Sequence, residues 1–148
     1  MDQKTKYLSY LTNLPVSHHI TINMNIKSYD QMTKAVRLIK SMLTRRLCGR
    51  RAKMNFISFI ETGSFTGNLH CHVVINAPHN NCQTDEYTTN ILNHIKSFKI
   101  NAIARADDAI KVDIINQTPE DKRKLFSYLL KAGPEAFFVD GSHVVSVK

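Results

Sequence analysis

The sequence predicts an α+β fold in which helices pack on an antiparallel sheet of about five strands. Three observations predict it. Apolar and polar residues alternate from residue 19 to 26, as in a half-buried strand. Apolar residues recur at helical spacing between residues 32 and 43. Residues 62–68 are rich in turn formers and separate two strand-like runs, which favours a hairpin. The length of 148 residues suits a single domain over residues 1–148.

The first strand, residues 19–26, leads into a helix with a recognisable start. Ser28 offers a hydroxyl cap and Gln31 follows three residues later, which is a capping-box pattern. One stripe of this helix is apolar and is expected to pack on the sheet: Met32, Ala35, Val36, Ile39, Met42 and Leu43. Gly49 is the expected end, because glycine adopts the left-handed backbone that often closes a helix.

Two strands and a second helix are expected next. The strands cover residues 54–60 and 69–76. The helix runs from a cap at Thr84 or Asp85 to about Phe98, with apolar residues at helical spacing.

A strand over residues 109–115 and a third helix complete the main pattern. Thr118 is a suitable cap and Pro119 suits the first helical position. The Gly-Pro pair at 133–134 ends the helix, and residues 136–147 are expected to form a C-terminal hairpin. The order βαββαβα predicts a ferredoxin-like, or split βαβ, core.

The charge and cysteine content narrow the class of partner and the compartment. Lys and Arg outnumber Asp and Glu by 20 to 12, which gives a net charge of +8. This surplus favours a polyanion such as nucleic acid, although a basic protein can also be merely soluble. The 3 cysteines lack Cys-x-x-Cys spacing, which indicates a reducing compartment. No signal peptide or membrane span is evident, so we expect an intracellular, cytoplasmic protein that is not secreted and does not contact a membrane.

A basic segment follows the first helix. Between residues 45 and 53, five of nine residues are basic: Arg45, Arg46, Arg50, Arg51 and Lys53. The segment is a candidate patch for binding DNA phosphates. A solvated helix end whose cations complement the helix dipole is the alternative.

His70 and His72 are the first candidate site residues. On a strand, residues two apart project from the same face, so the two imidazoles are expected to point together. Glu61 ends the preceding strand, and in a hairpin it can lie beside them. Two imidazoles and a carboxylate suit a divalent ion. Alternatively, these are only polar side chains on a half-exposed strand and a solvated acid at a strand end.

The third helix supplies a second group of candidates. Tyr128, Lys131 and Lys124 gather on its flank, beside the core-facing apolar residues. Nearby positive charge favours the phenolate form that a tyrosine nucleophile needs. A tyrosine at an ordinary helix–sheet boundary is the alternative.

Together these features resemble the HUH endonucleases, and most closely the rolling-circle replication initiators (Rep proteins) with a single catalytic tyrosine. Residues 19–25 are similar to their first motif, an apolar strand that ends in polar residues. His70-Cys71-His72 matches the second motif, with the preceding carboxylate falling on Glu61. The Tyr-x-x-Lys of the third motif falls on Tyr128 and Lys131. The resemblance covers about residues 18–133. Cys71 is unusual, because a bulkier apolar residue more often separates the histidines.

The resemblance implies a nuclease that nicks and rejoins single-stranded DNA at a replication origin, which would be presented as a hairpin. It implies Mg²⁺ or Mn²⁺ held by Glu61, His70 and His72. Tyr128 would form a 5′-phosphotyrosine and Lys131 would neutralise charge near the phosphate. A host helicase and polymerase would be partners, and the protein would act as a monomer or weak dimer. Its source would be a plasmid, a virus or a mobile element, with a nuclear location if the virus is eukaryotic.

Other functions fit parts of the pattern. A single-tyrosine HUH transposase shares the metal site, but a polar amide more often stands where this chain has Lys131. A relaxase usually places its tyrosine near the N-terminus. A histidine-triad hydrolase needs a third histidine where Val74 stands. A sheet with a basic rim can also bind single-stranded nucleic acid without cutting it.

Overall fold

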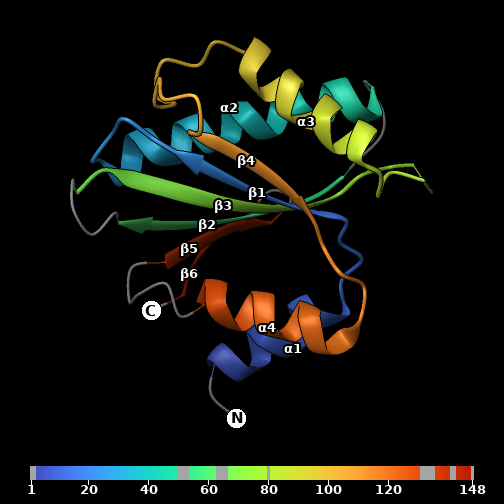
Figure 1. Cartoon of the computed structure of the whole chain (residues 1–148). Coiled ribbons are helices and arrows are strands. Elements are labelled where there is room, and N and C mark those ends of the chain that lie inside the picture. Colours follow the sequence, from blue (N-terminus) through green and yellow to red (C-terminus); the bar gives the residue numbers. More distant parts are fainter. Residues whose placement is uncertain are drawn as a thin grey trace.

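The computed structural model describes residues 3–49, 54–62, 67–79, 81–130, 136–140 and 143–147. Figure 1 shows helices above and below a twisted sheet. The elements follow in the order α1 (Gln3–Asn13), β1 (His18–Asn23), α2 (Tyr29–Cys48), β2 (Asn55–Thr62), β3 (Leu69–Asn76), α3 (Asp85–Ser97), β4 (Ile110–Ile114), α4 (Pro119–Leu130), β5 (Ala136–Asp140) and β6 (His143–Val147).

The sheet has the strand order β4-β1-β3-β2-β5-β6, and each neighbouring pair is antiparallel. Its first four strands, with α2 and α3 as the connections, form the predicted split βαβ core. The α+β prediction is therefore confirmed. The sheet is larger than the expected five strands, because both strands of the C-terminal hairpin extend it beyond β2.

Two apolar layers cover the sheet, with α2 and α3 on one face and α1 and α4 on the other (Figure 1). Alternation along β3 divides its side chains between them. Leu69, Cys71 and Val73 belong to the core under α2 and α3. Val74 belongs to the core beside α4. His70 and His72 keep the same alternation as Val74, so they lie on the face that α4 covers.

The expected helix starts are present. The Gln31 N–H donates to Ser28 Oγ over 3.4 Å, the Tyr87 N–H donates to Thr84 Oγ1 over 3.1 Å, and the Asp121 N–H donates to Thr118 Oγ1 over 3.3 Å. Gly49 follows α2 with a φ of 78°, in the left-handed region that favours glycine. The first strand is shorter than the expected 19–26, because after Asn23 only Met24 forms a bridge, to Ile103.

The helix α1 was not predicted from the sequence. Its apolar residues are few, and most of its side chains are polar. Leu11 is nevertheless buried, in a cluster that also contains Phe126 and Leu129 of α4. The helix is therefore stabilised by packing against a segment far away in the sequence. None of the helices in the described part of the chain has the length and apolar character needed to cross a lipid bilayer.

The burial of His18 leads to a prediction of how the stability of this fold depends on pH. The ring is buried between Ser17 Oγ, 2.8 Å from Nδ1, and Thr88 Oγ1, 3.2 Å from Nε2. Burial lowers the pKa of His18 from its ordinary 6.5, since an imidazolium is poorly solvated there. As the pH drops below 6.5, His18 binds a proton more readily in the unfolded chain than in the folded chain. The free energy of unfolding should therefore decrease over this pH range.

We expect His18→Gln to reduce that loss of stability, because glutamine has no charge to acquire. Urea unfolding of both proteins on either side of pH 6.5 measures the difference. An equal loss of stability in the two proteins would contradict the assignment to His18.

Candidate metal centre

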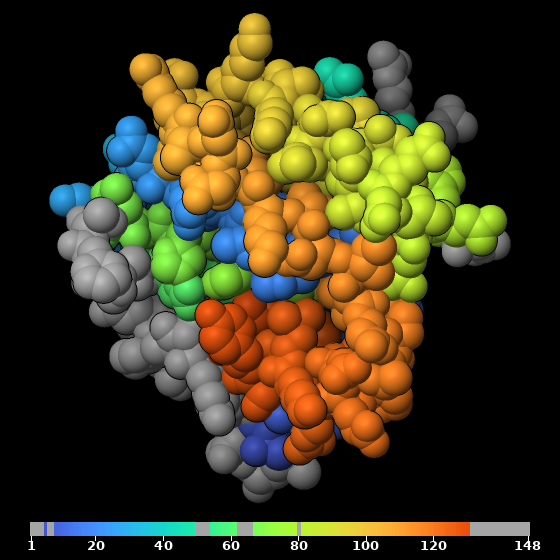
Figure 2. All heavy atoms as spheres, in the orientation of Figure 1, coloured from blue at the N-terminus to red at the C-terminus, as the bar shows by residue number. Residues whose placement is uncertain are grey.

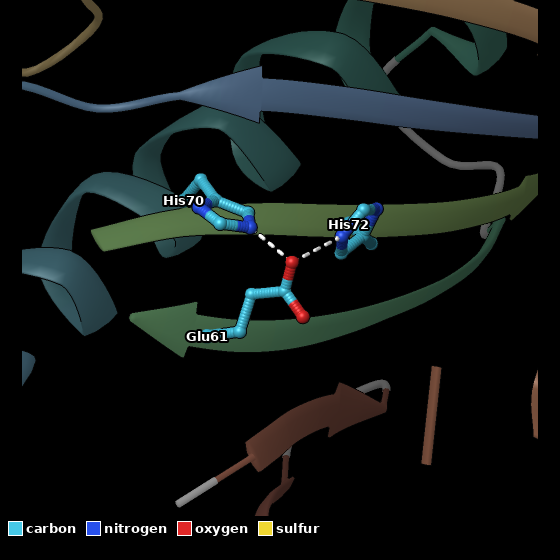
Figure 3. A group of neighbouring side chains, drawn as sticks. All are labelled: Glu61, His70 and His72. Carbon is cyan, nitrogen blue, oxygen red and sulfur yellow. Dashed lines mark hydrogen bonds and ion pairs between the residues drawn. The ribbon is translucent and has the colours of Figure 1, made fainter. Parts of the chain in front are cut away.

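Glu61, His70 and His72 converge at one end of the β2–β3 hairpin (Figure 3). Glu61 is the register partner of His70, and His72 lies two residues further along β3. The Nε2 atoms of both imidazoles face the same carboxylate oxygen, Glu61 Oε1. His70 Nε2 is hydrogen-bonded to it, and His72 Nε2 lies 3.0 Å from it. One potential ligand atom from each residue lies within 4.8 Å of the others. The three side chains therefore form a candidate metal site.

The surroundings keep Glu61 ionised. Burial by itself raises the pKa of Glu61, but hydrogen bonds from His70 and His72, together with their charges, outweigh it and bring the pKa to about 2. The carboxylate is therefore negative at neutral pH. His72 is buried, whereas His70 and Glu61 remain partly exposed. Two imidazole nitrogens and one carboxylate oxygen, at a site that is partly exposed through His70 and Glu61, suit a divalent cation that also binds water or substrate.

Tyr128 lies beside this cluster. Its ring meets the His72 ring edge to face, with the centroids 6.1 Å apart. The α4 residues Phe126 and Leu129 are buried against the sheet, and the Phe126 ring lies 6.4 Å from that of Phe59 on β2. This packing fixes α4, while Tyr128 itself is 60% exposed. The candidate nucleophile is therefore accessible and next to a candidate metal ligand.

Figure 2 shows where the sheet reaches the surface of the molecule. Atoms of β1 and β3, in blue and green, reach the surface between two orange segments. The upper one is the chain that leads into β4, and the lower one is α4.

Two lysines were predicted to lie near Tyr128, and the structure describes one of them. Lys124 is exposed on α4, one helical turn before Tyr128. Lys131 lies outside the described residues, so its role stays a prediction.

Arg45 and Arg46 are exposed in the last turn of α2. Arg50, Arg51 and Lys53 lie outside the described residues. The end of α2 lies towards the start of β2, whereas Glu61 is near the end of that strand (Figure 1). Glu61 is six residue positions after Asn55 along the strand, or about 20 Å. The structure therefore does not bring Arg45 and Arg46 together with the candidate metal ligands, and their DNA contacts remain a prediction.

Two residues of β1 that were not assigned a role from the sequence contact His72. His19 Nε2 lies 3.0 Å from His72 Nδ1, and Thr21 Oγ1 lies 3.4 Å from the same atom. Their alternation along the first strand was the available signal, because it places both on one face. That this face is shared with His72 depends on the pairing of β1 with β3.

His19 is neutral in this environment. Burial lowers its pKa most, and the charges of His72 and Lys111 lower it further against the opposing effect of Asp113. The resulting pKa is about 4. At neutral pH one ring nitrogen of His19 can therefore accept a hydrogen bond.

Comparisons with protein-family models, with curated proteins and with solved structures find no match to this chain. The conclusions about its function rest on its own geometry. That geometry is an α+β fold with a His-x-His pair and a glutamate gathered into a candidate metal centre.

Proposed function

We propose that this chain is a metal-dependent endonuclease of the HUH type, which nicks single-stranded DNA and rejoins it as a replication initiator does. The observation that carries the proposal is the position of Tyr128, whose exposed ring contacts His72 of the Glu61–His70–His72 cluster. A hydroxyl nucleophile beside a candidate site for a divalent cation provides the two components that phosphodiester transfer needs.

In the proposed reaction, Tyr128 Oη attacks the scissile phosphorus and loses its proton to solvent. A bond between Oη and phosphorus forms as the bond from phosphorus to O3′ breaks. The leaving oxygen takes up a proton and becomes a free 3′-hydroxyl. Glu61, His70 and His72 would hold Mg²⁺ or Mn²⁺, which when bound would stabilise the charge that develops on the phosphate.

The reaction is reversible in this scheme, because one phosphate ester replaces another. The strand downstream of the nick stays on Tyr128 as a 5′-phosphotyrosine, and attack by a 3′-hydroxyl rejoins it. The free 3′-hydroxyl can meanwhile prime a host polymerase. Lys124 on α4 would supply positive charge for the DNA backbone, and Lys131 would neutralise charge near the scissile phosphate.

The proposal is tested by trapping the covalent intermediate. Overlapping single-stranded oligonucleotides from the replicon that carries the gene, labelled at their 3′ ends, are incubated with the protein and Mn²⁺ and separated on a denaturing gel. A labelled protein band that disappears with EDTA is the expected result, since the 3′ label stays on the fragment joined to tyrosine. Tight binding of the same oligonucleotides without any adduct would favour a binding module instead.

The basic patch at the end of α2 gives a separate prediction. If Arg45 and Arg46 each contact one DNA phosphate, the double substitution R45A/R46A should weaken binding of single-stranded DNA. It should also reduce the slope of log K against log salt by about 1.4, or about 0.7 per contact. Fluorescence anisotropy at several salt concentrations measures the slope.

The control for this measurement is K34A/R37A, which removes two exposed cations from the middle of the same helix. A slope that is unchanged in R45A/R46A, or reduced equally in both variants, would contradict a specific contribution of the patch.

A further inference from the structure

His72 forms hydrogen-bonding contacts through both of its ring nitrogens. Nε2 faces Glu61 in the candidate metal centre, and Nδ1 faces β1 on the other side of the ring. On β1, His19 Nε2 lies 3.0 Å from Nδ1 and Thr21 Oγ1 lies 3.4 Å from it. The planes of the two rings are inclined by only 29° and their centroids are 5.2 Å apart, an arrangement that suits a hydrogen bond between the two nitrogens.

We infer that His19 is a positioning residue, which holds the His72 imidazole in the orientation that directs Nε2 into the metal centre. The inference rests on the proposed metal-dependent function. A histidine that binds a metal through Nε2 carries its proton on Nδ1, and this N–H must be donated to a partner. His19 Nε2 is the closer of the two β1 atoms that can accept it.

The sheet itself fixes this partner. Thr21 is the register partner of His72 across β1 and β3, and His19 lies two residues earlier on the same face. His19 is in turn opposite Asp113 of β4, which lies 3.7 Å from Lys111. The surroundings of His19 thus comprise one acid and one base on β4, with His72 on β3. A line of polar side chains runs from the edge strand to the candidate metal ligand.

The orientation of the His72 ring is important because only three side chains in the described part of the chain form the candidate metal centre. His70 and Glu61 are partly exposed and come from the ends of their strands. His72 is the buried member of the cluster. Its ring is oriented by Glu61 at Nε2 and by His19 at Nδ1. Without His19, the contact that remains at Nδ1 among the described residues is the longer one to Thr21 Oγ1 at 3.4 Å. The ring can then adopt other rotamers and tautomers more readily, and the arrangement of ligands becomes less well defined. Loss of such a supporting partner typically weakens metal binding by about 10- to 100-fold.

The experiment measures Mn²⁺ binding by titration calorimetry for the wild type, His19→Ala and His19→Gln, with His94→Ala on α3 as a histidine control. We expect His19→Ala to bind Mn²⁺ about 10- to 100-fold more weakly. His19→Gln should recover most of the affinity, since its amide oxygen can accept the His72 Nδ1–H. His94→Ala should match the wild type. Thermal melting confirms that each variant is folded.

The nicking assay provides an independent measurement. His19→Ala should need more Mn²⁺ for half-maximal nicking but should approach the wild-type rate at saturating Mn²⁺, as expected of a residue that supports a ligand. Three results would overturn the inference. Unchanged Mn²⁺ affinity in His19→Ala would show that His19 does not position His72. Equal losses in the Ala and Gln variants would make His19 a ligand instead. A wild type that binds no Mn²⁺ would overturn the proposed function as well, and only that outcome does so.

Discussion

Replacing Tyr128 with phenylalanine is expected to abolish the covalent protein–DNA adduct and to lower the nicking rate by about 10³-fold or more, because the variant has no hydroxyl to attack phosphorus. The fold should be retained. The tyrosine ring is 60% exposed, and α4 is fixed to the sheet by Phe126 and Leu129. Phenylalanine can also preserve the edge-to-face contact with His72. The measurement is the denaturing-gel assay with 3′-labelled DNA.

The matched control is Tyr10→Phe, which changes another exposed tyrosine, on α1. It should form the adduct at the wild-type rate. Mn²⁺ affinity should be unchanged in Tyr128→Phe, which separates loss of the nucleophile from damage to the metal centre. An adduct that persists in Tyr128→Phe would assign the covalent link to another residue and would contradict the proposed role of Tyr128.

The change Glu61→Gln is expected to have the second large effect. It preserves the size of the side chain but removes the negative charge on which both imidazoles converge. The pKa of Glu61 is about 2, so the wild-type site contains a full carboxylate at neutral pH. An amide oxygen is a much poorer ligand for a divalent cation. We therefore expect Mn²⁺ affinity to fall by about 100-fold or more and metal-dependent nicking to fall with it.

Titration calorimetry with Mn²⁺ tests this prediction, with Glu120→Gln as the control. Glu120 is an exposed acid in the first turn of α4, so its replacement removes the same charge from the protein away from the cluster. Glu120→Gln should bind Mn²⁺ as the wild type does. Equal affinities of Glu61→Gln and the wild type would exclude Glu61 as a ligand, whatever the nicking activity of the two proteins.

Local patterns in the sequence determined a large part of this fold. The alternation along β1 and β3, the apolar stripe of α2 and the caps at Ser28 and Thr118 each depend on neighbouring residues only. Such signals are readable without knowledge of tertiary contacts. The same holds for the shared face of His70 and His72, because residues two apart on any strand project together.

Contacts between distant segments were decided only by the tertiary structure. Glu61 faces His70 because the β2–β3 register pairs these two residues, and a slip by one residue would turn Glu61 to the opposite face. α1 was missed because its stability comes from packing against α4 rather than from its own pattern.

The separation of Arg45 and Arg46 from the cluster likewise follows from the direction of α2, which no local pattern specifies. The contact between Tyr128 and His72 depends on how α4 packs across β2. The contact between His19 and His72 depends on the pairing of β1 with β3. The sequence alone thus indicated the candidate side chains and determined that His70 and His72 share a strand face. Their distances to one another depend on strand register and helix packing, which are set by the folded chain as a whole.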